Sequence, residues 1–127
     1  MRRDVERALS AGAFGLSTGV YYPPAAAAST EELEGVCAAL RGQDAVLAMH
    51  LRDEGDHVDA ALQEALAVSA SCGARLVISH HKVVGRANFG RSQQTLAMLA
   101  EETGGQSYRA RDVKDLSGIY EQVAAEL

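Results

Sequence analysis

The chain has no tryptophan, and it has only two prolines and two cysteines among its 127 residues. Cys37 and Cys72 both lie in helical patterns and form no CxxC pair, which argues against a disulfide framework or a cysteine zinc site. We therefore expect two packed thiols.

Long apolar runs and an excess of positive charge are also missing. No run approaches the roughly 18 to 20 residues of a membrane span, and the charges of "MRRDVERALS" are spread through that segment, unlike those of a signal peptide. The net charge is −5 and the basic residues are scattered, which argues against nucleic-acid binding. We expect a cytoplasmic protein that binds neither membranes nor nucleic acid. With 47% apolar residues, its length suits one globular domain.

Strand-like and helix-like segments alternate about every thirty residues, a pattern typical of βα units on a parallel sheet. The pattern favours an α/β fold, and it leaves a closed barrel and an open sheet as alternatives. Expected strands are residues 12–18, 45–49, 75–79 and, more weakly, 104–110; expected helices are residues 3–11, 29–41, 57–71, 92–102 and 112–127.

Short polar residues mark the expected helix starts. Ser29 with Glu32 three residues later forms a capping box. Asp56 is expected to cap the third helix, and Asp112 with Asp115 the last one.

Two histidines stand directly after the two most apolar strands, His50 after "AVLAM" and His80 after "RLVIS". Functional groups in parallel α/β folds gather at the carboxyl ends of the strands, so the two imidazoles can converge if the strands are neighbours. Catalytic zinc usually takes three protein ligands and a water, and this pattern supplies two of them. The alternative is that each histidine is an ordinary hydrogen-bonded residue at a strand end.

Three segments resemble the central part of the N-acyl-D-amino-acid deacylases, or D-aminoacylases, of the amidohydrolase superfamily. They are "GAFGLSTGVYYPP", "MHLRDEGDHVDAALQEAL" and "VISHHKVVGRANFGRSQQTLAML". The resemblance covers residues 5–98, and its "HxRDEG" and "SHHK" motifs are specific. It implies a zinc hydrolase on a (β/α)₈ barrel that removes the acyl group from an N-acyl-D-amino acid. Residues 1–96 would be the part around barrel strands 4 to 6, about three of the eight units.

The resemblance also implies roles for single residues. His50 and His80 would bind the metal, and Tyr22 would lie near the scissile amide. Lys82 would reach the substrate carboxylate, with a solvated loop charge as the alternative. His81 should point away from His80 and be structural.

The charged triplet Arg52, Asp53 and Glu54 permits two interpretations. A carboxylate that accepts the second ring N–H of a metal-binding histidine fixes the orientation of that ring, so the triplet could support the metal ligands. It could equally form a salt-bridged loop. Similarly, Asn88 and Phe89 could line the pocket or belong to a glycine-hinged surface loop.

Several parts of the family's active site are not found in these 127 residues. They are the HxH pair of the first strand, the bridging cysteine and the catalytic aspartate of the eighth strand, which shuttles a proton in metal-assisted hydrolysis. We therefore expect the chain to be inactive on its own and to bind zinc weakly.

The last part of the chain departs from this family. Residues 97–127 resemble the end of a von Willebrand factor type A domain, with its "TGG" turn, last strand and closing helix, but the metal motif "DxSxS" of such domains is absent. We expect one C-terminal βα unit, joined to the deacylase-like part near residues 92–100.

A second class of function stays open, a small open-sheet α/β binding module without catalysis. The two classes differ in the distance between the imidazole nitrogens of His50 and His80, because two ligands of one zinc lie about 3 to 4 Å apart. Sheet edges left exposed would also favour a homodimer.

Overall fold

The computed structural model describes residues 1–126, with the side chains of Phe89, Ser92, Glu102, Thr103 and Glu126 left aside. Residues 1–92 and the residues from 93 onward form two compact units, which are described separately. The boundary between the two units lies near the predicted join, at residues 92–100, between the deacylase-like part and the C-terminal part. That these two parts have different origins stays a prediction.

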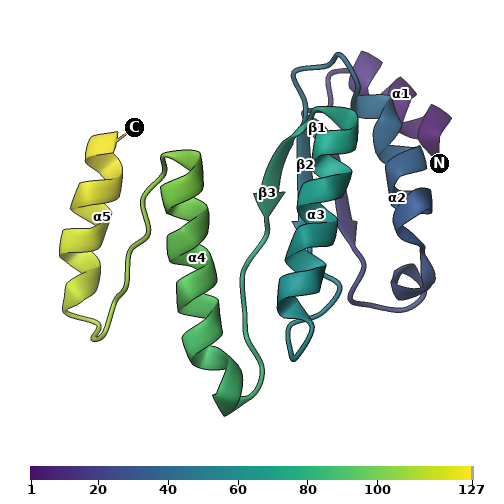
Figure 1. Cartoon of the computed structure of the whole chain (residues 1–127). Coiled ribbons are helices and arrows are strands. Elements are labelled where there is room, and N and C mark those ends of the chain that lie inside the picture. The colour runs from purple at the N-terminus through teal and green to yellow at the C-terminus, as the bar shows by residue number, and fades with distance from the viewer. Residues whose placement is uncertain (127) are drawn as a thin grey trace. The chain divides into compact units, whose positions relative to one another are not determined.

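The first unit is built on a parallel sheet of three strands in the order β1, β2, β3 (Figure 1). β1 (Gly15–Gly19), β2 (Val46–His50) and β3 (Arg75–Ile78) are hydrogen-bonded in register. Each strand lies within a few residues of its predicted position. The predicted α/β fold with a parallel sheet is therefore confirmed, although the first strand starts three residues later than expected.

A helix follows each of the first two strands, as βα units require. The turn η1 (Ala25–Ala27) precedes α2 (Thr30–Cys37), which continues into η2 (Ala38–Leu40), and α3 (Val58–Cys72) connects β2 to β3. α2 and α3 pack against each other beside the sheet (Figure 1). Alternate residues of β2, Leu47 and Met49, are fully buried, because side chains along a strand point to opposite faces.

The ends of α2 and α3 follow the local sequence with one exception. The Ser29 hydroxyl accepts a hydrogen bond from the backbone N–H of Glu32 at 3.2 Å, as the capping box predicts. The end of α3 is also as expected, with Gly73 in the left-handed conformation at φ +68°. The prediction that Asp56 caps α3 is wrong, because His57 is the N-cap residue and the Asp56 carboxylate accepts a hydrogen bond from Asn88 instead.

The two cysteines are packed thiols, as expected. Cys37 ends α2 and Cys72 ends α3, and both are buried and free. Burial, with a smaller contribution from the neighbouring Cys72, raises the pKa of the Cys37 thiol to about 11. A thiol with so high a pKa is a poor nucleophile and metal ligand at neutral pH.

An ionic contact ties the loop after β2 to the helices. The Arg52 guanidinium donates to both carboxylate oxygens of Glu64 in α3, at 2.8 and 2.9 Å, and to the carbonyl of Ala26 at 2.9 Å. Thr30 donates a further hydrogen bond to Glu64 at 2.7 Å. Burial by itself would raise the pKa of Glu64, but the hydrogen bonds from Arg52 and Thr30 and the charge of Arg52 outweigh it, and the pKa lies below its ordinary value of 4.5.

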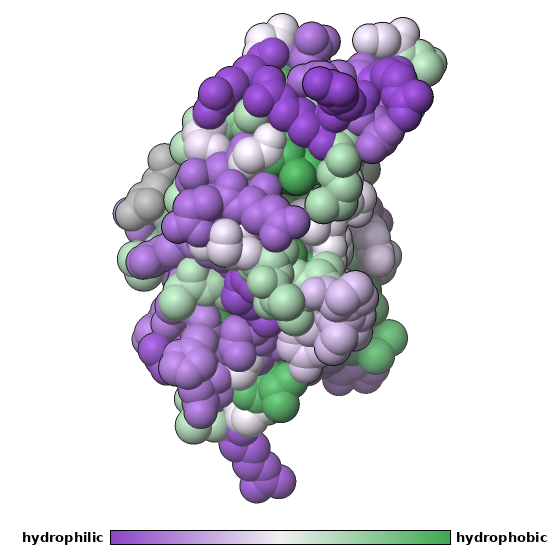
Figure 2. Space-filling model, turned by 90° about the vertical axis from the view of Figure 1, so that its right-hand side faces the viewer, coloured by the Kyte–Doolittle hydropathy of each residue, from purple (hydrophilic) through white to green (hydrophobic). Residues whose placement is uncertain are grey.

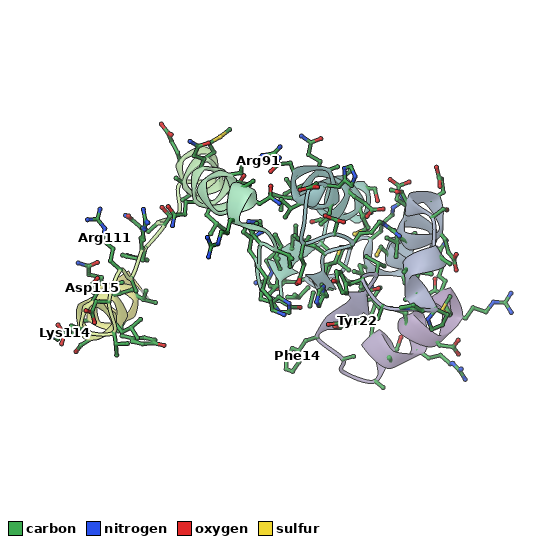
Figure 3. The ribbon with its side chains drawn as sticks, turned by 90° about the horizontal axis from the view of Figure 1, so that it is seen from below. Phe14, Tyr22, Arg91, Arg111, Lys114 and Asp115 are labelled. Atoms are coloured by element: carbon green, nitrogen blue, oxygen red, sulfur yellow. The ribbon has the colours of Figure 1, made fainter. Side chains whose placement is uncertain are left out.

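The part from residue 93 onward contains most of α4 and all of α5. α4 (Phe89–Thr103) follows the short 3₁₀ helix η3 (Arg86–Asn88) directly, and α5 (Asp115–Glu126) ends the described chain. At the start of α5, Asp115 accepts hydrogen bonds from the backbone N–H groups of Arg111 and Asp112, and Figure 3 shows Asp115 at this end.

The predicted C-terminal strand at residues 104–110 is wrong, since the described structure has no strand there. The glycines serve the helix before it: Gly104 takes φ +72°, and the N–H of Gly105 bonds to the carbonyl of Ala100 at 2.8 Å. This is a glycine C-cap of α4. A strand needs a neighbour to pair its backbone groups, and the described residues of this unit form only helices and connections.

The N-terminal helix α1 (Arg2–Ser10) has no buried residue. Its charged side chains form the strongly hydrophilic upper part of the face in Figure 2, and Arg2 pairs with Glu6 at 2.9 Å. Phe14, just before β1, is 92% exposed and projects from the chain in Figure 3. Within residues 1–126, none of the helices has the length and apolar character to cross a membrane.

We predict that Gly15→Ala destabilises the fold. A Cβ atom at Gly15 would lie 1.9 Å from the backbone oxygen of Val46, so β1 would have to move away from β2. The expected loss is about 1–3 kcal/mol in the free energy of unfolding, measured by urea denaturation. The control is Gly35→Ala in α2, where a Cβ meets nothing within 4 Å and helix propensity should add about 0.5–1 kcal/mol. Equal stability of the two variants would contradict this account.

We further predict that Glu64 makes stability depend on acid. Its pKa in the folded chain is lowered, so its ionised form stabilises the fold above pH 4.5, and this contribution disappears as the pH falls through the folded value. Glu64→Gln should cost on the order of 1 kcal/mol at pH 7, and the difference from the wild type should narrow below pH 4.5. Unfolding curves at several pH values measure this, with the exposed Glu101→Gln as the control. A difference that is constant with pH would refute it.

Candidate metal centre

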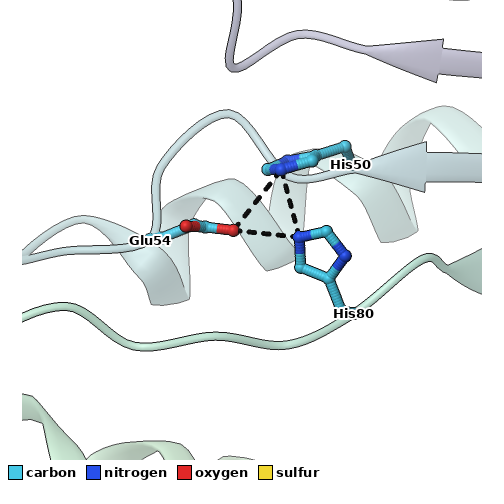
Figure 4. A group of neighbouring side chains, drawn as sticks. All are labelled: His50, Glu54 and His80. Carbon is cyan, nitrogen blue, oxygen red and sulfur yellow. Dashed lines mark hydrogen bonds and ion pairs between the residues drawn. The ribbon is translucent and has the colours of Figure 1, made fainter.

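Three side chains from the carboxyl ends of β2 and β3 meet at one point (Figure 4). The Nε2 atoms of His50 and His80 are 3.1 Å apart. Oε1 of Glu54 lies 3.2 Å from Nε2 of His80 and 3.4 Å from Nε2 of His50. The predicted convergence of the two imidazoles is therefore observed.

Parallel pairing places the two histidines side by side. Met49 is in register with Ile78, and the backbone N–H of Ser79 bonds to the carbonyl of Met49 at 2.9 Å. The pairing thus extends to the residue before His80. His50 is the last residue of β2, so both rings stand at the same edge of the sheet.

The loop after β2 turns Glu54 back toward the strand ends. One oxygen of Asp53 accepts the backbone N–H groups of Gly55 at 2.7 Å and His57 at 3.1 Å, which forms a tight turn. The carbonyl of Glu54 accepts a 2.6 Å hydrogen bond from the N–H of Val84 in the loop after β3. These bonds fix the backbone on which the Glu54 carboxylate is carried.

The hydrogen bonding of His50 prepares its other nitrogen for a cation. Nδ1 of His50 lies 3.0 Å from the carbonyl oxygen of Leu51, and a carbonyl only accepts, so Nδ1 carries the hydrogen. Nε2 of a neutral ring then presents a lone pair to Nε2 of His80 and to the carboxylate of Glu54. Lone pairs facing at these distances repel each other unless a proton or a metal ion lies among them.

The donor set and its spacing fit a divalent metal. Two imidazole nitrogens and a carboxylate oxygen form a known zinc ligand set, and ligands at about 2.1 Å around a tetrahedral ion are about 3.4 Å apart. The three ligand atoms all lie within 4.8 Å of one another. The side chains of His50 and Glu54 are 12% and 9% exposed, whereas that of His80 is 37% exposed. The centre is thus shielded on one side and accessible on the side of His80.

Tyr22 and Lys82, predicted to face the substrate, both lie beside the centre. The hydroxyl of Tyr22 is 3.4 Å from Nε2 of His50. Nζ of Lys82 is 3.9 Å from Oε1 of Glu54, and 59% of its side chain is exposed. Both side chains can therefore contact a ligand bound next to the two histidines.

Arg52 and Asp53 are placed differently from Glu54. Arg52 extends to Glu64 and Ala26, and Asp53 holds the turn. Among the described residues, the hydrogen bonds of Arg52 and Asp53 hold the loop, as in the salt-bridged alternative, and do not involve the rings of His50 or His80. Of the three residues, Glu54 alone contacts the two rings among the described residues. The expectation was a carboxylate at the ring nitrogen that does not bind the metal. Glu54 instead faces Nε2, the nitrogen directed at the centre.

The remaining predicted residues lie in the surrounding structure. Nε2 of His81 is buried and has no hydrogen-bond partner among the described residues. Burial lowers the pKa of His81, against a smaller opposing effect of Asp59, which suits a neutral, packed ring. Asn88 is 4% exposed and donates to Asp56 and to the carbonyl of Val84, so it joins two loops. The side chain of Phe89 lies outside the described residues.

The sequence interpretation missed the direct place of Glu54 among the ligand atoms. A signal was present: Glu54 follows His50 by four residues, and the intervening Asp53 with Gly55 favours a tight turn. A turn of this kind brings a side chain back toward the residue at the end of the strand.

The chain is similar to several known proteins, although no family model matches it. It is 52% identical over 101 residues to an N-acyl-D-aspartate deacylase and 48% identical over 99 residues to a D-aminoacylase, both from Alcaligenes xylosoxydans xylosoxydans. These matches cover 79% and 78% of this chain and 20% of each relative. The chain thus spans about one fifth of the length of these curated relatives.

Solved structures give the same result. A D-aminoacylase structure described as defining a novel subset of amidohydrolases is 48% identical, with a TM-score of 0.72 over 80% of this chain and 22% of that one. An N-acyl-D-glutamate deacylase from Bordetella bronchiseptica, complexed with zinc and a phosphonate inhibitor, is 40% identical, with a TM-score of 0.72 over 83% of this chain and 23% of that one. A further similar structure is that of a D-aminoacylase with a binuclear metal centre. Over about four fifths of its length, this chain is therefore a homologue of one segment of the N-acyl-D-amino-acid deacylases.

Proposed function

We propose that the first unit is the metal-binding segment of a zinc-dependent hydrolase that deacylates N-acyl-D-amino acids. The observation that carries the proposal is the triangle formed by His50, Glu54 and His80, with sides of 3.1, 3.2 and 3.4 Å. In the open-sheet binding module the two rings need not converge. Similarity to deacylases, one of them complexed with zinc, supports the choice of reaction.

The three side chains would hold the metal as a two-histidine, one-carboxylate set. When bound, zinc lowers the pKa of a coordinated water and polarises an amide carbonyl. Zinc suits the mixed nitrogen and oxygen donors better than calcium or magnesium, which prefer oxygen alone. The hydrogen bond from Nδ1 of His50 to Leu51 keeps the lone pair of Nε2 directed at the centre.

Substrate would be positioned by the two exposed groups beside the triangle. The ammonium of Lys82 lies within reach of the accessible side and can pair with the carboxylate of an N-acyl amino acid. The Tyr22 hydroxyl, 3.4 Å from Nε2 of His50, is placed to hydrogen-bond the amide group next to the metal. The positions and chemistry of the two groups support these roles, as does the family resemblance.

We also propose that the 127 residues alone do not turn over substrate. Deacylation needs a carboxylate that moves a proton from water to the leaving amine. Among the described residues the group of potential ligands contains one carboxylate, that of Glu54, and it already contacts both imidazoles. A ligand carboxylate is not free for proton transfer.

The remaining parts of the proposal concern the whole chain. The three βα units would correspond to strands 4 to 6 of a (β/α)₈ barrel, and residues 97–127 to a piece of different origin that resembles the end of a von Willebrand factor type A domain. The relatives match about 100 residues of this chain, so the unmatched part is about as long as residues 97–127. Cytoplasmic location and a homodimer formed through the outer edges of β1 and β3 also stay proposals.

We predict that the chain binds one zinc ion through this triangle. His50→Ala, Glu54→Ala and His80→Ala should each weaken binding at least about tenfold, because each removes one ligand atom. Calorimetric titration measures the affinity, with circular dichroism to check folding. His57→Ala is the control, since His57 is exposed and lies outside the triangle, and it should bind within about twofold of the wild type. Equal losses in all four variants, or none in the first three, would refute the proposed site.

We predict that the zinc-loaded chain releases no D-amino acid above background from N-acetyl-D-aspartate, N-acetyl-D-glutamate or N-acetyl-D-methionine. The reason is the missing free carboxylate. Chromatography of the free amino acid measures turnover, with a full-length D-aminoacylase as the positive control. Zinc-dependent turnover that His80→Ala abolishes would overturn the proposed inactivity while supporting the proposed metal site.

A further inference from the structure

We infer that Tyr21 is a positioning residue that holds the His50 imidazole in the orientation needed for metal binding. This inference rests on the proposed function, because it assigns a new role in the same centre. The sequence motifs and the ligand spacing assign no role to Tyr21. Its contact with the ring of His50 does assign one.

The ring of His50 is enclosed by aromatic rings. Its centroid lies 5.3 Å from that of Tyr21 at an interplanar angle of 33°, and 5.2 Å from that of Tyr22 at 73°. The two tyrosines also contact each other edge to face, at 5.0 Å and 74°. His80 completes the group at 4.4 Å and 83° from His50. Of these three rings, that of Tyr21 is nearest to parallel with the imidazole, and the other two meet it nearly edge on.

The strand register brings these rings to the side of His50. Gly19 is in register with His50 at the end of β1, and the two tyrosines follow after Val20. A Cβ at Gly19 would be in ordinary van der Waals contact, at 3.9 Å, with both the Cβ of His50 and a ring carbon of Tyr22. Tyr22 thus packs close to the strand ends and contacts Tyr21 edge to face.

Hydrogen bonding alone does not fix the imidazole. The bond from Nδ1 to Leu51 lets the ring tilt about that bond, and the 3.4 Å contact of Nε2 with the Tyr22 hydroxyl is long for a hydrogen bond. Rotation about χ2 of histidine also has broad minima. A tilt moves Nε2 away from His80 and Glu54. An aromatic ring in contact with the imidazole at 5.3 Å resists this motion, and such aromatic pairs contribute about 0.5–1.5 kcal/mol beyond the buried area.

The exposure of the residues agrees with this role. The side chain of His50 is 12% exposed and that of His80 is 37% exposed, although both stand at the same sheet edge. Tyr21 itself is 41% exposed. The ring of Tyr21 therefore contacts the less exposed ligand, His50, whereas His80 stays accessible.

The experiment compares Tyr21→Leu with Tyr21→Phe in the full chain. Leucine removes the flat ring, whereas phenylalanine keeps the ring and removes only the hydroxyl. The first readout is made without metal, by ¹⁵N nuclear magnetic resonance of the histidine rings near pH 8. The wild type and Tyr21→Phe should show His50 protonated at Nδ1 in one environment. Tyr21→Leu should show averaged or broadened His50 signals.

The second readout is zinc affinity by calorimetry. Tyr21→Leu should bind about tenfold more weakly, in line with other residues that orient metal ligands, and Tyr21→Phe within twofold of the wild type. Unchanged His50 signals in Tyr21→Leu, or loss of affinity in Tyr21→Phe as large as in Tyr21→Leu, would overturn the inference. If the wild type binds no zinc, the proposed function fails, and the metal-free spectra still decide the role of Tyr21.

Discussion

The structure of the centre depends on the parallel pairing of β2 with β3. That pairing sets the two strands in register, with His50 one residue and His80 two residues beyond the Met49–Ile78 pair, so that both histidines stand at the same edge of the sheet. Register alone would place His50 level with Ser79, because Met49 is paired with Ile78. The chain bends at Ser79, and His80 beyond this bend brings its Nε2 to 3.1 Å from that of His50.

The rest of the first unit protects this register. Leu47 and Met49 in β2 are fully buried, and a shift by one residue would turn them to the opposite face of the sheet. The close approach of β1 at Gly15 allows β2 to be paired on both sides. The bidentate contact of Arg52 with Glu64 holds the loop that follows β2 against α3. Residues that do not touch the centre thus determine where its ligands stand.

Much of this arrangement could be predicted from the sequence, because it is encoded by local patterns. Apolar runs of strand length, the capping box at Ser29 and the histidines at two strand ends gave the parallel sheet and the convergence of the rings. The place of Glu54 could not be read in the same way, since it depends on a turn held by Asp53 and on a hydrogen bond to Val84, 30 residues away in the chain. The expected strand at residues 104–110 failed for a related reason. Strand formation requires a neighbour, and the glycines that suggested a turn before a strand instead close α4.

The hydrogen bond between the N–H of Val84 and the carbonyl of Glu54, at 2.6 Å, joins the loop that carries Glu54 to the loop that carries His80. Parallel strands have no tight turn between them, so their loops ordinarily move independently beyond the last ladder bond. Here one backbone bond extends the coupling past the end of the sheet. A displacement of either loop is therefore resisted by the other, and the Glu54 carboxylate and the His80 ring are kept together beside His50, which β2 itself holds.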